Sequence, residues 1–149
     1  MKTIFNESDY QELLGRLDSF NQSSERQWGK MTPSQMMEHT ARALEMAAGI
    51  RRSEQRLIGK LLGWIFRKDF LSERPFPKSA PTGPDFIITD DPEFDATKAR
   101  LRQLIVDFHA LGAESVDGNI HGFFGPLTGD EWGISQYKHV DHHLRQFNS

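Results

Sequence analysis

The chain has 149 residues, of which 26% are charged and 37% hydrophobic, so we expect one soluble globular domain spanning residues 1–149. The net charge of −3 provides no basic field for nucleic acid, and the longest apolar run is too short and too polar to span a membrane. Because cysteine is absent, disulfides are excluded and a tight metal site must use histidine or carboxylate ligands; a cytoplasmic location fits this composition.

The first third of the chain predicts two amphipathic helices. Apolar residues recur at helical spacing over residues 8–21, and Ser8 begins a sequence with the form of a capping box. A second start signal combines Thr32 as the cap, proline at the first helical position, and Gln35 reaching back to the cap. We expect this second helix to continue to about Ala48, where a glycine follows.

The middle of the chain is less regular. Residues 54–70 show a third helical pattern, although Gly59 and Gly63 each weaken it by up to about 1 kcal/mol. Four prolines in residues 72–91 argue against a long helix there, and residues 85–89 are the one short strand candidate. We therefore expect an extra helix that packs outside the main core or bridges two of its helices, followed by a long connection.

Two further helices are predicted in the last third of the chain. Asp91 and the following proline open one of them, and its apolar stripe ends at Gly112. Thr128 and Glu131 form another capping box, which opens a final helix extending to about Phe147. Four long amphipathic helices cannot bury their apolar stripes alone, so the sequence predicts an all-α fold built as a four-helix bundle.

Three histidines suggest a metal site. His139 and His143 lie one helical turn apart, at the i and i+4 spacing with which two imidazoles chelate one ion. His39 lies early in the second helix, at the border of its apolar face. If the second and last helices run antiparallel, the three imidazoles meet at one level, as in an open zinc or nickel site. The alternative is three structural histidines that are satisfied by hydrogen bonds.

Two segments give the sequence a recognisable pattern: WGKMTPSQMMEH at residues 28–39, and HGFFGPLTGDEWG together with YKHVDHHLRQF within residues 121–147. Together they resemble one family of unknown function within the DinB-like (YfiT-like) superfamily of proposed metalloenzymes; the middle of the chain resembles it only weakly. The resemblance implies a four-helix bundle of up-down-down-up topology with a long connection between its second and third helices. It also implies a metal triad of His39, His139 and His143.

This resemblance implies a function only in outline. Relatives include thiol-dependent transferases and hydrolase-like proteins, and many are homodimers. We therefore expect a metal-dependent enzyme whose divalent ion, zinc or nickel, activates a water or a thiol for hydrolysis or transfer on a small-molecule substrate. The alternatives are a non-catalytic, dimeric helical bundle that binds metal or a small molecule, and a purely structural domain without metal. No nucleic-acid or membrane partner is expected.

Four other residues could support such a site or belong to the scaffold. Gln35, one turn before His39, and His121, in the loop before the last helix, are candidates for contacts to the ligands or to substrate. For His121 the favoured alternative is a loop residue bonded to the backbone. His142 is expected at the boundary of the buried face, where it could line a pocket, and His109 is interpreted as structural.

In the topology implied by the resemblance, the proline-rich connection 72–91 arrives beside the metal. We expect it to line or cover the pocket, with Phe76, Phe86 or Ile87 supplying an apolar wall. The alternative is an ordered segment that merely wraps the surface of the bundle.

Overall fold

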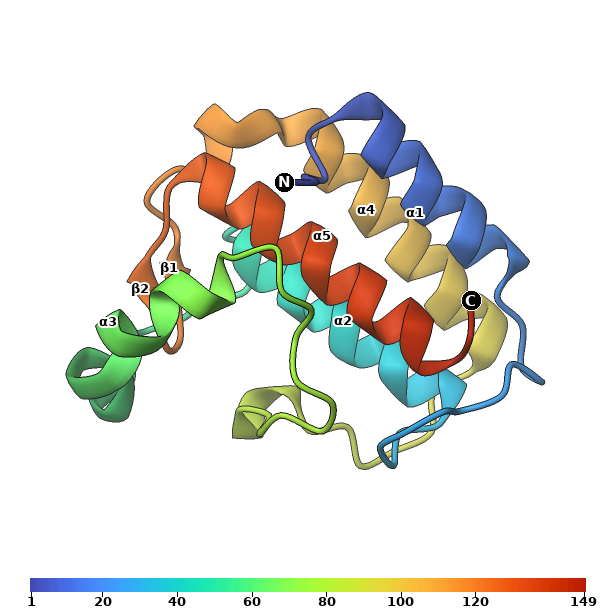
Figure 1. The fold of residues 1–149 in the computed structure, drawn as a ribbon. Helices are drawn as coiled ribbons and strands as arrows, with labels where there is room; N and C mark the ends of the chain where they lie inside the picture. Colours follow the sequence, from blue (N-terminus) through green and yellow to red (C-terminus); the bar gives the residue numbers. More distant parts are fainter.

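A computed structural model describes all residues 1–149 and confirms the mostly helical fold predicted from the sequence (Figure 1). No helix is both long enough and apolar enough to cross a membrane. The elements in chain order are α1 (Glu7–Ser19), α2 (Pro33–Ala47), α3 (Leu57–Phe70), the short 3₁₀ turn η1 (Pro84–Phe86), α4 (Phe94–Val116), β1 (Ile120–His121), β2 (Gly125–Pro126) and α5 (Gly129–Gln146).

Helices α2 and α5 begin where their capping boxes predicted. The Thr32 hydroxyl accepts from the backbone N–H of Gln35 at 3.2 Å, and the Gln35 side chain accepts from the N–H of Thr32 at 3.0 Å. At α5, the Thr128 hydroxyl accepts from the N–H of Glu131 at 3.2 Å, and the Glu131 carboxylate accepts from the N–H of Thr128 at 2.8 Å. Because both helices carry the histidines of interest, these two caps fix the positions of those histidines along the helices.

The other two long helices begin at different caps from those expected. Asn6, rather than Ser8, caps α1: its side-chain oxygen accepts from the N–H of Asp9 at 3.2 Å, and the Ser8 hydroxyl donates to the same oxygen at 2.7 Å. At α4 the cap is Glu93 rather than Asp91, since the Glu93 carboxylate accepts two N–H groups of the first turn. Because Asn6 satisfies the N–H of Asp9, the helix begins two residues before the position expected from Ser8.

Two local expectations in the second half were wrong. Gly112 has a φ of 74° and kinks the chain, but helical structure resumes and continues to Val116. Residues 85–89 form no strand, because Pro84 opens a 3₁₀ turn there and no neighbouring strand offers a hydrogen-bonded partner. The only sheet is a small antiparallel pair in which Ile120 faces Pro126.

The contacts at helix ends define the relative directions of the long helices. The N–H of Gln27, just before α2, donates to the carbonyl of Gln146 at the end of α5 at 2.7 Å. At the opposite end, Asn119 donates to the carbonyl of Ala47 at 2.9 Å and accepts from the indole of Trp132 at 3.1 Å. Helices α2 and α5 are therefore antiparallel, the condition that the sequence argument required for the three histidines to meet.

Helices α1, α2, α4 and α5 enclose one core (Figure 1). Helices α2, α4 and α5 contact one another, and α1 packs against α4 and α5. The largest fully buried side chains come from all four helices and their ends: Phe20, Met36, Leu44, Leu101, Phe108, Trp132 and Phe147.

Helix α3 lies outside this group of helices and packs mainly on the hairpin (Figure 1). Gly59 and Gly63 both face the backbone of Phe123, and a Cβ atom at Gly59 would overlap the Phe123 carbonyl oxygen. The two glycines that weakened the helix prediction are thus the residues that allow α3 to dock closely. With its glycine side against the hairpin, α3 leaves its large apolar side chains exposed.

Candidate metal centre

His39 of α2 and His139 and His143 of α5 lie together at one level of the molecule. The Nε2 atom of His139 is 3.1 Å from Nε2 of His39 and 3.1 Å from Nε2 of His143. One potential ligand atom from each residue lies within 4.8 Å of the other two. Tetrahedral zinc with bonds of 2.0–2.1 Å separates its ligand nitrogens by about 3.3 Å, so the two short separations need little adjustment to hold an ion.

Two of the three imidazoles are oriented through their Nδ1 atoms. His39 Nδ1 donates to the carbonyl oxygen of Phe86 at 2.9 Å, and a carbonyl can only accept. His143 Nδ1 donates to Oε1 of Gln146 at 2.9 Å, while Nε2 of Gln146 donates to the carbonyl of Trp28 at 2.9 Å and thereby fixes the amide orientation. Both Nδ1 atoms therefore carry hydrogen, and both neutral rings direct a bare Nε2 lone pair at His139.

The number of available protons is too small for the contacts among these rings. With His39 and His143 bare at Nε2, only His139 can place a hydrogen between the nitrogens, and it can serve one 3.1 Å contact at a time. If His139 carries its hydrogen on Nδ1 instead, neither contact has one, and Nδ1 is buried without a partner. In either tautomer of His139, at least one of the two 3.1 Å nitrogen–nitrogen contacts therefore has no hydrogen in it, an arrangement that a cation would relieve.

Burial keeps the three histidines neutral. It lowers the pKa of His39 below the usual 6.5, outweighing the hydrogen bond to Phe86. Burial, followed by the nearby His39, lowers the pKa of His143 to about 3. Burial and then repulsion from His143 and His39 hold the pKa of His139 well below 6.5. Neutral imidazole is the form that binds metal, so at neutral pH none of the three rings has to lose a positive charge, and His139 needs only to carry its hydrogen on Nδ1.

Gln35 and His109 have structural partners away from the three rings. Gln35 completes the α2 cap, and its Nε2 donates to the carbonyl of Asp90 at 3.1 Å, which fastens the long connection to the start of α2. His109 donates from Nδ1 to the carbonyl of Ile4 at 2.9 Å and stacks on Tyr10 with ring centroids 4.0 Å apart. Gln35 is therefore part of the α2 cap, and His109 is part of the contact between α1 and α4.

His121 holds the hairpin loop. Its Nδ1 accepts from the backbone N–H groups of Phe123 and Phe124 at 3.0 and 3.2 Å, and its ring lies 5.6 Å from that of Trp132. Burial lowers the pKa of His121 to about 4. This is the backbone-bonded arrangement favoured from the sequence, and the structure does not bring His121 to the three converging nitrogens.

His142 lies beside the centre and lines a large cleft. Its ring centroid is 5.1 Å from that of His143 and 5.5 Å from that of Trp28, and burial lowers its pKa. The cleft has a volume of about 1070 Å³, and Phe76 and Lys138 line it together with His142 and Trp28. None of the three converging histidines lines this cleft, whereas His142 lines it and has its ring beside that of His143.

The long connection contributes one residue to the centre. Phe86 supplies the carbonyl that holds His39, and its ring meets that imidazole edge-on with centroids 6.2 Å apart. Phe76 instead stacks on Phe70 and borders the cleft, and Ile87 is 55% exposed. Of the three apolar residues proposed as a wall, only Phe86 contacts one of the three converging histidines.

Sequence reasoning did not single out the groups that orient the imidazoles. Gln146 lies three residues after His143, a spacing that places its amide beside the ring, and this signal was available in the sequence. The Phe86 carbonyl carried no such signal, because a backbone acceptor can belong to any residue type. Gln136, which sequence reasoning also passed over, has a side-chain Oε1 that is buried without a partner.

Comparison with known proteins gives a family but no described relative. No curated protein and no solved structure matches the chain. A family model described as "Protein of unknown function (DUF1569)" matches residues 5–149, nearly the whole sequence. The chain therefore belongs to the DUF1569 family of proteins of unknown function.

Proposed function

We propose that this protein is a metal-dependent enzyme of the DinB-like superfamily. His39, His139 and His143 would hold one divalent ion, zinc or nickel, since imidazole nitrogen suits both metals. The reaction would be a hydrolysis or a transfer on a small-molecule substrate, with a water or a thiol as the activated group. The observation that carries the proposal is the convergence of three Nε2 atoms that share too few protons.

The directions of the four core helices support the superfamily placement. Ile4, before α1, donates to the carbonyl of Gly133 at the start of α5, so these two helices run in the same direction. Lys98, near the start of α4, donates to the carbonyls of Asp18 and Phe20 at the end of α1, so α4 runs the opposite way. Together with the antiparallel α2–α5 pair, this arrangement fits the up-down-down-up bundle that the sequence resemblance implied.

The chain's own residues prepare the centre for chemistry. Phe86 and Gln146 hold two rings in the tautomer that presents Nε2, and burial keeps all three ligands uncharged. When bound, a divalent ion with three neutral ligands supplies a Lewis acid that lowers the pKa of a water or thiol.

The environment of the centre favours a small substrate. The cleft beside α5 carries aromatic groups from Trp28 and Phe76 and cationic groups from Lys78 and Lys138. The Lys78 ammonium lies 4.6 Å from the centre of the Trp28 ring, and that of Lys138 lies 4.6 Å from the centre of Phe76. We propose that substrate enters from this cleft past His142. A cytoplasmic location and the absence of nucleic-acid and membrane partners remain part of the proposal, supported by the composition.

A panel of activated esters and of thiol plus electrophile substrates tests the proposed enzyme. Protein loaded with Zn²⁺ or Ni²⁺ is compared with metal-free protein and with His143→Ala. We expect turnover of at least one class that requires the metal and is lost in the variant. Metal binding without turnover on any class would instead favour the non-catalytic binding bundle.

A further inference from the structure

Two buried polar atoms on α5 lack hydrogen-bond partners and are complementary to each other. One is Nδ1 of His139, and the other is Oε1 of Gln136, whose residue is only 4% exposed. Positions three residues apart on an α-helix are neighbours on its surface, about 60° apart around the axis. A potential donor and an acceptor are thus both unpaired within one turn of the same helix.

Metal binding would favour a hydrogen bond between these two atoms, His139 Nδ1 and Gln136 Oε1. A His139 that binds an ion through Nε2 must carry its hydrogen on Nδ1, which then becomes a buried donor in need of an acceptor. The other two ligands already follow this pattern, with Phe86 and Gln146 as their acceptors. Gln136 offers the buried unpaired acceptor nearest to His139 along the helix.

We propose that Gln136 is the positioning residue of His139: its Oε1 accepts from His139 Nδ1–H when the centre holds a metal. Each ligand histidine would then donate to one oxygen, and none of the three rings could rotate freely. This inference rests on the proposed metal centre, but it concerns a residue that the family resemblance did not assign. Its role is to orient a ligand, since no contact between Gln136 and the proposed ion is needed.

Metal affinity and stability of three variants test this role. Gln136→Leu removes the acceptor, Gln136→Glu retains it, and Gln146→Leu removes the acceptor already seen for His143. We expect Gln136→Leu to weaken Zn²⁺ affinity about 10- to 100-fold, with a similar loss in Gln146→Leu and retention in Gln136→Glu. In the metal-free protein, Gln136→Leu should keep or raise the melting temperature, because it removes an unpaired buried oxygen.

Proton-detected NMR of the imidazole nitrogens in the Zn²⁺-loaded protein provides a second readout. The wild type should show a slowly exchanging His139 Nδ1–H, and Gln136→Leu should lose or broaden this signal while the His39 signal persists. Unchanged affinity and an unchanged His139 signal in Gln136→Leu would overturn the inference, as would a loss of metal-free stability with normal affinity. Failure of the wild type to bind Zn²⁺ would instead defeat the proposed metal centre itself.

A separate observation concerns α3, whose outer side carries an apolar surface. Seven large side chains of this helix are 38–78% exposed: Leu57, Ile58, Leu61, Leu62, Trp64, Ile65 and Phe66. At about 150–250 Å² for a large side chain, these fractions amount to roughly 800 Å². That area is above the few hundred Å² usual for the largest apolar patch of a monomer.

We further propose that this α3 surface is covered by the α3 surface of a second copy of the chain. Its area equals the roughly 800 Å² that each partner buries in a standard protein interface, and two-fold dimers are the commonest assemblies. The exposed charges of α3 are Lys60, Lys68 and Asp69, which sum to only +1, and Arg67 is paired with Glu131, so two copies of this surface repel each other little. No segment of residues 1–149 covers this surface.

Sedimentation velocity across a concentration series tests the dimer. The wild type should dimerise, and Leu61→Asp should be monomeric with an unchanged helical circular dichroism spectrum, because Leu61 is 72% exposed. Ile50→Asp is the matched control, since Ile50 is 67% exposed but lies outside α3, and it should remain dimeric. A monomeric wild type, a dimeric Leu61→Asp, or a wild type that associates with anionic vesicles instead of itself would overturn this proposal.

Discussion

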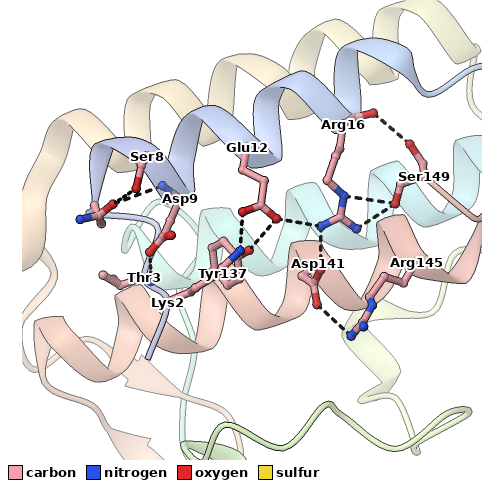
Figure 2. Close-up of polar contacts among 11 residues, drawn as sticks. Lys2, Thr3, Ser8, Asp9, Glu12, Arg16, Tyr137, Asp141, Arg145 and Ser149 are labelled. Carbon is pink, nitrogen blue, oxygen red and sulfur yellow. Dashed lines mark hydrogen bonds and ion pairs between the residues drawn. The ribbon is translucent and has the colours of Figure 1, made fainter.

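The polar groups on the two sides of α5 differ in whether they have hydrogen-bond partners. On the side facing α1, polar groups pair with one another (Figure 2): Arg16 donates to Asp141 at 2.7 Å and to the carbonyl of Ser149 at 2.8 Å, and the Tyr137 hydroxyl donates to Glu12 at 3.3 Å. On the side facing α2, the histidine nitrogens converge without enough protons, and Gln136 Oε1 has no partner.

This difference separates a packing contact from a binding site. Paired groups at a partly hydrated contact satisfy each other and fix the register of two helices, so they need nothing further. Buried groups left unpaired lower the stability of the domain, so each calls for an explanation, and a bound ion is the one proposed here for the α2 side. The contrast predicts that metal acts on the α2 side alone, whereas salt and surface mutations act on the α1 side.

The largest expected effect is stabilisation by metal. At a free Zn²⁺ or Ni²⁺ concentration 1,000-fold above the dissociation constant, the free energy of unfolding should rise by about 4 kcal/mol. For a domain of this size, the melting temperature should then rise by on the order of 10 °C. Calorimetry of the wild type and of His39→Ala measures this shift, and an equal shift in the variant would refute a site built on His39.

The second effect is a loss of stability in acid from His121, a buried histidine whose Nδ1 is already paired. Its folded pKa of about 4 lies below the usual 6.5, so the unfolded chain takes up the proton first as pH falls. Its contribution is complete above pH 6.5 and is lost as pH falls towards about 4, up to about 3 kcal/mol.

Denaturant unfolding at pH 7 and at pH 4.5 measures this contribution as the difference between wild type and His121→Asn. Asparagine can accept from the same loop N–H groups but does not titrate, so the variant should lose less stability over this interval. Equal losses in both proteins would mean that His121 is not the group responsible.

The smallest effect belongs to the paired side of α5. Arg16→Ala should lower the free energy of unfolding by about 1 kcal/mol, because its partners are only partly buried, and high salt should shrink that difference. Arg145→Ala is the matched control, since Arg145 reaches Asp141 only at 3.5 Å and should cost less. Neither change should alter metal affinity; a change in affinity would show that the two sides of α5 are coupled.

The sequence was sufficient where a local signal was complete within a few residues, although the single-residue signals at Ser8, Asp91 and Gly112 misplaced helix ends. Thr32 and Thr128 marked their helices correctly because a capping box is complete within four residues. The i and i+4 spacing of His139 and His143, together with the early position of His39, anticipated the cluster once antiparallel packing was assumed.

Features that depend on distant partners were not predictable in this way. The docking of Gly59 against the Phe123 backbone, the Phe86 carbonyl that holds His39, and the outward apolar side of α3 all depend on segments remote in sequence. Residues 85–89 show that a local pattern can also predict an element that does not form. Their apolar run is compatible with a strand, but a strand requires a neighbouring strand that the fold does not provide.

Metal analysis of protein purified without a histidine tag tests the central claim most directly. The wild type, after equilibration with Zn²⁺ or Ni²⁺ and removal of free ion, should retain one equivalent per chain, and His139→Ala should retain none while staying helical. A wild type that retains no metal, or a variant that retains as much as the wild type, would contradict a centre shared by His39, His139 and His143.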